Sequence, residues 1–177
     1  MMAKRFIEEG RADIVLTGGV DEIYPGMLKG LHSMGQLRSF AAGFSEGAGI
    51  LVLENAAHAR SRNARILAGV GDIRTIGRLS PGNYEEGLDR LLPAPVHPDM
   101  IALSGTATCE KALLERLPAV PMLDTGKILG RSLAMGGLAM TALVLKLEAG
   151  QRGLHLAASP EGPYYAIDLI GGDPVSS

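Results

Sequence analysis

The stretch RADIVLTGGVDEIYPGMLKGLHSMGQLRSFAAGFSEGAGILVLE, residues 11–54, decides the fold. Residues 12–17 form an almost unbroken apolar run that ends at Gly18-Gly19, and residues 47–53 form a second run. Such runs are typical of strands that are buried on both faces. We interpret the stretch as strand, glycine turn, helix, loop, glycine turn and strand, which predicts an α/β core.

The composition limits the classes of partner and site. The 177 residues are 46% apolar with a formal net charge of −2, which indicates one soluble domain with a real core. With 17 basic against 19 acidic residues and no Trp, nucleic acid is not expected as a partner. The single cysteine, Cys109, excludes an internal disulfide and fits a reducing cytoplasm. The four histidines lack metal-ligand spacing, so no metal is expected.

The rest of the chain alternates between helical and extended patterns. The N-terminal residues resemble the end of a longer helix, which hints at an upstream half. Further helices are expected at residues 55–63, 84–92 and 130–148, and strands at 66–76, 100–103, 120–123 and 164–170. The 130–148 helix is apolar nearly all round, so it should be buried, and it is too short to cross a bilayer. The connector at 93–98, PAPVHP, divides the chain into residues 1–92 and 99–177.

Four motifs, in order, resemble one known family. They are LTGGVDE, SEGAGILVLE followed by HARSRNARILAGV, SGTAT, and K-x-x-G-R ahead of an apolar helix. This order resembles the later part of the β-ketoacyl-acyl-carrier-protein synthases. The resemblance implies a thiolase-like α/β fold, in which two related halves pack as layered sheets and helices, and work on acyl thioesters carried by phosphopantetheine.

The family's catalytic positions are altered in this chain. The resemblance places the nucleophilic cysteine upstream of Met1, and Cys109 matches no family nucleophile. The two catalytic histidines of the family correspond to Ser104 and Arg131. Serine can donate a hydrogen bond but is no base at neutral pH unaided, and arginine keeps its proton. The resemblance therefore implies a degenerate site.

Several other residues match family positions. Lys127 resembles the active-site lysine, although its spacing to the following Gly-Arg pair is one residue short. Thr106 and Thr108 match threonines that contact the pantetheine arm, and capping of the next helix would select the same residues. Glu115 matches an acidic residue of that helix, but a solvated glutamate would look identical.

The spacing of the glycine motifs does not indicate a ligand-binding loop. Gly47 and Gly49, like Gly18-Gly19, lack the spacing of phosphate-binding loops. We expect them to let a sheet and a helix approach closely, and we expect Glu46 to anchor the loop by accepting hydrogen bonds.

The sequence therefore predicts a degenerate ketosynthase-like subunit, for which three hypotheses stay open. The first is a non-catalytic partner, like the chain-length factors of aromatic polyketide and aryl-polyene pathways, that forms a heterodimer with an active ketosynthase and shapes its acyl pocket. The second is half of a split β-ketoacyl-acyl-carrier-protein synthase, whose other chain brings the cysteine for condensation with a malonyl carrier protein. The third is a fragment of such an enzyme.

These hypotheses share their expected partners. An acyl carrier protein is a possible partner, and its phosphopantetheine would enter as a substrate arm, with no cofactor bound. A membrane is not expected, and the expected location is the cytoplasm.

Overall fold

The structure is a computed structural model of the chain, and it describes residues 1–37, 45–77, 84–93, 97–104, 115–117, 119–130, 135–158 and 163–172. The helices are α1 (Met2–Glu8), α2 (Pro25–Ser33), α4 (Ala56–Ser61), α5 (Tyr84–Leu91), α7 (Thr125–Leu129) and α8 (Met135–Lys146). The strands are β1 (Ile14–Asp21), β2 (Gly47–Glu54), β3 (Ala68–Ile76), β4 (Met100–Ser104), β5 (Met122–Asp124), β6 (Arg152–Ala158) and β7 (Tyr164–Gly171).

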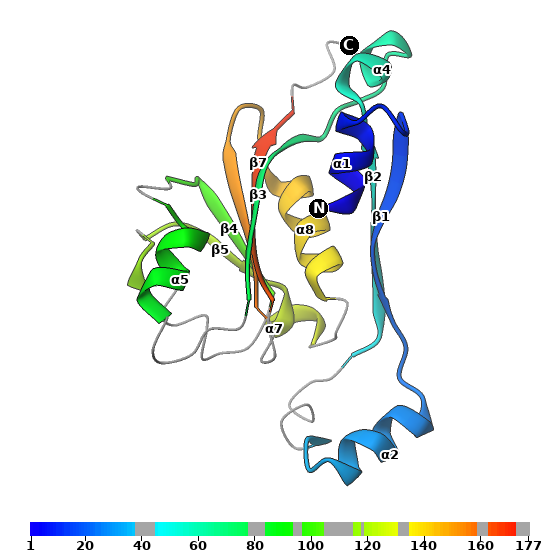
Figure 1. The fold of residues 1–177 in the computed structure, drawn as a ribbon, viewed down its shortest axis with the longest axis vertical. Coiled ribbons are helices and arrows are strands. Elements are labelled where there is room, and N and C mark those ends of the chain that lie inside the picture. Colours follow the sequence, from blue (N-terminus) through cyan, green and yellow to red (C-terminus); the bar gives the residue numbers. More distant parts are fainter. Residues whose placement is uncertain are drawn as a thin grey trace.

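The elements form stacked layers (Figure 1). One sheet has five strands in the order β3-β7-β6-β4-β5, and the other consists of β1 and β2. In the larger sheet β4 is parallel to β5 and β6, whereas β7 is antiparallel to β6 and β3. Helix α8 lies between the two sheets, and α5 covers the far face of the larger one. Helix α2 projects from this body, and none of its residues is buried.

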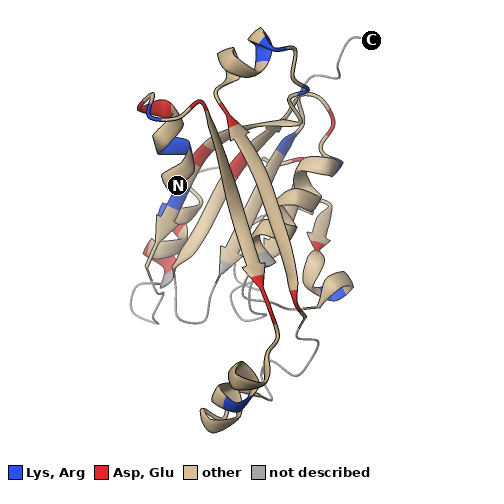
Figure 2. Ribbon diagram, turned by 90° about the vertical axis from the view of Figure 1, so that its right-hand side faces the viewer, with Lys and Arg blue, Asp and Glu red and all other residues tan. Residues whose placement is uncertain are grey.

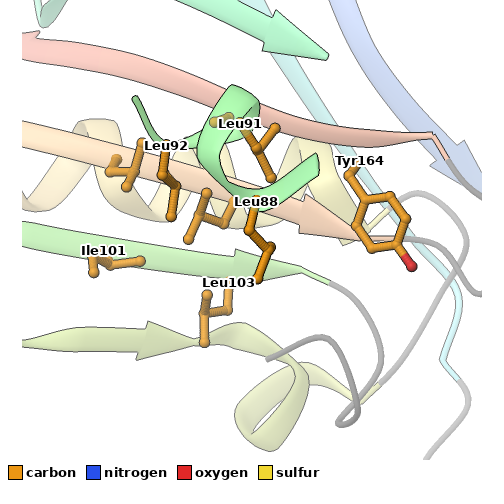
Figure 3. Close-up of a cluster of buried hydrophobic side chains, with 9 residues drawn as sticks. Leu88, Leu91, Leu92, Ile101, Leu103 and Tyr164 are labelled. Atoms are coloured by element: carbon orange, nitrogen blue, oxygen red, sulfur yellow. The ribbon is translucent and has the colours of Figure 1, made fainter. Parts of the chain in front are cut away.

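Side chains on one face of the central strands form the core between the larger sheet and α5. Side chains of β4 and β6 point alternately to the two faces of the sheet, because successive residues of a strand face opposite ways. One set meets the apolar side of α5 (Figure 3). The resulting cluster comprises Ile101 and Leu103 of β4, Leu154 and Leu156 of β6, Tyr164 and Ala166 of β7, and Leu88, Leu91 and Leu92 from α5 and its C-terminal end. This cluster fixes α5 on the sheet.

The opposite face of the same sheet packs against α8. Ala102 of β4 and Leu169 of β7 join Ala139, Met140 and Leu143 of that helix. Leu51 of β2 reaches the same cluster from the smaller sheet. Helix α8 is therefore enclosed on two sides, which confirms the expectation that it is a largely buried helix.

Glycines set the distance between the smaller sheet and α8. A Cβ atom built on Gly137 would lie 2.4 Å from the carbonyl oxygen of Gly49 and 3.0 Å from the amide nitrogen of Gly19. A Cβ atom on Gly49 would lie 2.4 Å from the carbonyl carbon of Gly137. The backbones of β2 and α8 thus touch with no room for a side chain. Gly49 therefore lies where the smaller sheet and α8 approach each other most closely among the contacts described above.

Three expectations from the sequence need correction. Gly18-Gly19 is no turn, because β1 runs straight through it to Asp21 in register with β2. Strands β1 and β2 are covered on one face, not two: β1 alternates between exposed and half-buried residues along its whole length. Strand β6 is absent from the expected elements, although it lies at the centre of the larger sheet between β7 and β4.

Along the sequence, the boundary between the two sheets falls between β2 and β3, because β1 and β2 form the smaller sheet and all later strands form the larger one. This point lies earlier than the connector at 93–98, of which residues 94–96 fall outside the described part of the chain. Strand β3 belongs to the larger sheet, because it pairs with the last strand, β7. Helix α5 packs on the same sheet. Residues 78–83 and 173–177 also lie outside the described residues.

Replacing Gly137 by Ala should separate the layers. We expect Gly137→Ala to lower the free energy of unfolding by about 1–3 kcal/mol, the usual cost of overpacking, because its methyl group meets backbone atoms that cannot yield. The matched control is Gly30→Ala in α2, where a Cβ atom meets nothing within 4 Å and helix propensity improves. Denaturant unfolding measures both; equal effects of the two changes would contradict the close contact.

Candidate functional site

The site candidates gather at one edge of the larger sheet. Strand β4 ends at Ser104, β5 ends at Asp124 and β6 ends at Ala158. These three strands are parallel, so their carboxyl ends meet at the same edge. In open α/β sheets this is the edge at which ligands bind.

A buried serine–histidine pair lies at this edge. The Ser104 Oγ is 3.0 Å from the His155 Nε2, and the side chains are 8% and 3% exposed. The register brings them together, because Ala102 of β4 pairs with His155 of β6 and Ser104 lies two residues further on the same face. That face is the one covered by α8. A Cβ atom on Gly136, in the first turn of α8, would lie 3.7 Å from the His155 Cε1.

Burial keeps the imidazole of this pair neutral. Desolvation lowers the pKa of His155 to about 4, because the charged form would lie in an apolar layer. The His155 Nδ1 is buried and has no hydrogen-bond partner among the described residues. We assign the proton to Nε2, since a buried N–H without an acceptor is the rarer kind of unsatisfied group.

This assignment defines what the pair can do. The Nε2–H donates to the Ser104 Oγ, and the serine hydroxyl is then free to donate to a further acceptor. An imidazole with a pKa of about 4 is a poor base at neutral pH. The pair is suited to hold an acceptor oxygen rather than to activate serine as a nucleophile.

Of the other residues predicted for the site, Lys127 and Glu115 are described, and both are exposed. Lys127 lies on α7 with its side chain 82% exposed, and its ammonium pairs with Asp124 at 3.1 Å. It therefore does not share the buried environment of Ser104. Glu115 is exposed. Thr106, Thr108 and Arg131, together with Cys109, lie outside the described residues, so their roles stay predictions.

The predicted structural residues lie at the start of β2. Glu46 accepts a hydrogen bond from the backbone N–H of Ile23 at 3.1 Å, the kind of anchoring contact expected for it. A Cβ atom on Gly47 would lie 3.1 Å from the Leu138 Cδ1 of α8. These contacts attach the loop end to the rest of the body.

Sequence reasoning missed two buried polar residues. His155 lies within LHLAA, where its only signal was a histidine in an apolar run. Thr125, the first residue of α7, is buried, and its Oγ1 has no partner among the described residues. It follows β5 directly and so lies at the same edge as Ser104.

Other kinds of site find little support. The described residues contain no group of three His, Cys, Asp or Glu side chains that could hold a metal ion. No helix in the described part of the chain is long and apolar enough to span a membrane. An open pocket of about 380 Å³ is lined by residues of α1 and β3, including Lys4, Arg5 and Arg74. Arg74 is already paired there with Asp168 at 2.6 Å.

Several solved structures are similar to this chain in fold. The ishigamide ketosynthase/chain length factor aligns with a TM-score of 0.72 at 20% identity over 97% of this chain and 52% of its own. The AntDE:AntF complex, a type II PKS acyl-carrier protein with its ketosynthase, gives 0.74 at 20% identity over 97% and 59%. The peroxisomal 3-ketoacyl-CoA thiolase of Saccharomyces cerevisiae gives 0.66 at 15% identity over 94% and 68%. No family model and no curated protein matches the sequence.

These similarities confirm the predicted fold class, which is thiolase-like. This chain spans about half the length of the first two chains. The yeast thiolase is a five-layered α-β-α-β-α structure built from two core domains of identical topology.

Acid should destabilise the fold through His155. The folded-state pKa, about 4, lies below the ordinary 6.5, so the unfolded chain takes up the proton first. The contribution of the neutral His155 to the free energy of unfolding is complete above pH 6.5. It should fall by up to about 3 kcal/mol as the pH approaches 4. Denaturant unfolding of the wild type and of His155→Gln across this range measures the difference.

The matched control is His32→Gln, which changes an exposed histidine on α2. It should keep the wild-type dependence on pH, whereas His155→Gln should flatten it. The carboxylate of Glu54 loses its stabilising role in a lower range, because hydrogen bonds from Arg62 lower its pKa from 4.5 to about 2. Identical slopes for the wild type and His155→Gln would contradict the buried neutral imidazole.

Proposed function

We propose that this chain is a ketosynthase-like subunit of polyketide or fatty-acid biosynthesis, of the β-ketoacyl-acyl-carrier-protein synthase family. In this proposal it pairs with an active ketosynthase in the cytoplasm and helps to shape the acyl pocket, without carrying out condensation itself. The thiolase-like fold supports the family, since ketosynthases and a ketosynthase/chain length factor share it.

The observation that carries the non-catalytic role is the buried Ser104–His155 pair. The resemblance puts a catalytic histidine at position 104, and the chain has there a serine that is held by a neutral imidazole. Such a pair donates a hydrogen bond but accepts protons poorly at neutral pH. The exposed position of Lys127 supports the same conclusion, because a solvated ammonium has little influence on a buried substrate.

The proposed partners are based on the same similarity to solved structures. One similar structure contains an acyl-carrier protein bound to its ketosynthase, and another is a ketosynthase/chain length factor. A ketosynthase is therefore the proposed partner, and an acyl carrier protein would deliver the phosphopantetheine arm.

A second candidate function is half of a split synthase, or a fragment of one, that takes part in decarboxylative condensation. The observation in its favour is that His155 brings an imidazole to within 3.0 Å of Ser104, close to where the family has a histidine. Here the pair would stabilise charge that develops on the thioester oxygen.

Co-expression with an active ketosynthase from the same source tests both functions. The partner proposal expects a stable complex by light scattering, in which Ser104→Ala and His155→Gln change the rate of condensation with malonyl carrier protein by less than about 2-fold. The split-synthase candidate expects a loss of about 100-fold or more, the usual scale for removing such a group.

A control variant of the partner shows which of the two chains carries out condensation. Changing the nucleophilic cysteine of the partner ketosynthase to alanine should abolish condensation under the first proposal. If the chain stays monomeric and forms no complex, the partner role is excluded.

A further inference from the structure

Two hydroxyl groups are buried at the ends of neighbouring strands of the larger sheet. Leu103 of β4 pairs with Asp124 of β5. The residues that follow them are Ser104, which is 8% exposed, and Thr125, which is 4% exposed. Helix α7 begins at Thr125 and contacts both β4 and α8. Figure 1 shows α7 at this end of the sheet, close to the start of α8.

Both residues belong to the layer between the larger sheet and α8. Ala102 and its partner Leu123 pack in the cluster on the α8 side of the sheet. Alternate residues of a strand share a face, so Ser104, two residues after Ala102, lies on that side too. Thr125 follows Leu123 by the same two residues, at the point where the chain turns into α7. We call Ser104 and Thr125 together the hydroxyl site.

Both hydroxyls have hydrogen-bonding capacity left over. The Thr125 Oγ1 is buried without a partner among the described residues. The Ser104 Oγ lies 3.0 Å from the His155 Nε2, and in the tautomer assigned above it accepts that bond and keeps its own hydrogen for another acceptor. Buried polar groups are almost always hydrogen-bonded. Two buried donors at adjacent strand ends therefore indicate a site for an acceptor atom.

Gly136 leaves room beside the serine hydroxyl. A Cβ atom built on it would lie 3.8 Å from the Ser104 Oγ and 3.7 Å from the His155 Cε1, which are ordinary van der Waals distances. A methyl group would thus fit at this position, in contrast to Gly137, where it meets the backbone. The glycine therefore leaves a space of about the size of a methyl group against the Ser104 hydroxyl.

The charges around this layer favour a neutral ligand. Lys127 is exposed and paired with Asp124, and α8 carries Lys146 in its last turn, at the opposite end from Gly136. Strands β1 and β2, on the other side of α8, are free of charged residues over most of their length and have acidic residues towards their ends (Figure 2). A buried anion needs a cation or several donors, which these described residues do not offer.

We infer that the hydroxyl site binds the oxygen of a ketone on an acyl chain and so selects ketone-bearing chains over saturated ones. The Ser104 and Thr125 hydroxyls donate to the two lone pairs of one carbonyl oxygen, and Gly136 leaves room for the carbonyl group. That the ligand is an acyl chain rests on the proposed function, whereas the preference for a ketone follows from the two buried hydroxyls.

The selectivity follows from the cost of an unmade hydrogen bond. A saturated chain in this layer would leave both buried hydroxyls without an acceptor, whereas a ketone would satisfy both. A site built around such a hydrogen bond rejects an analogue without the partner more strongly than an apolar pocket does. We therefore expect a preference of at least about 10-fold for the ketone-bearing chain.

Calorimetric titration with two matched probes tests this selectivity on the full chain, alone and mixed with an active ketosynthase. The probes are the pantetheine amide of a β-keto acyl chain and that of the saturated chain of equal length, which differ only in the ketone. Thr125→Val and Ser104→Ala should reduce the preference to less than about 2-fold, because each removes one donor. Thr75→Val, at an exposed position of β3, is the matched control and should keep the preference.

Gly136→Ala adds a variant that should fold, because its methyl group meets no clash and alanine favours a helix. It should weaken binding of the keto probe by about 10-fold, since the methyl group takes the space beside Ser104.

Three outcomes would overturn the inference. They are equal affinities of the wild type for the two probes, no binding of either probe, and equal weakening of both probes by Thr125→Val, which would assign the hydroxyls to the amide carbonyl that the probes share. A chain that prefers the keto probe but forms no complex with a ketosynthase would contradict the proposed partner role and leave the hydroxyl site intact.

Discussion

The contact between the backbones of Gly49 and Gly137 is the constraint on which the architecture depends. Neither residue has space for a Cβ atom, so β2 lies against the first turn of α8 with no side chain between the two backbones. The same turn of α8 carries Gly136, which faces the imidazole of His155. One helix end is therefore held between the two sheets, and its position decides how closely the serine–histidine pair is enclosed.

The enclosure explains the chemistry of the pair. A histidine near water would titrate close to neutral pH, but the layer between the sheet and α8 excludes water and lowers the pKa of His155. The neutral ring then serves as a fixed hydrogen-bond donor to Ser104. The same burial that positions the ring therefore weakens it as a base, which separates this arrangement from an activated serine.

Much of the fold could be predicted, for reasons that lie in particular residues. Motif order indicated the thiolase-like arrangement, and the apolar character of α8 followed from its sequence. The half-exposed β1–β2 sheet could not be predicted, because an apolar run does not reveal whether both its faces are covered. Strand β6 was missed because His155 interrupts its short apolar run. The pairing of His155 with Ser104 depends on the register of β4 and β6, which no local pattern contains.

The pairing of β3 with β7 has a consequence for how the protein is made. Strand β3 is the first strand of the larger sheet to be synthesised, and its partner β7 is the last. Contacts between segments so distant in sequence carry a large cost in chain entropy, and they slow folding. On the ribosome β3 cannot pair with β7 until the elements between them have been synthesised. The larger sheet can close only after residues 164–171 have been synthesised, and until then its apolar strands lack their partner and are exposed to aggregation.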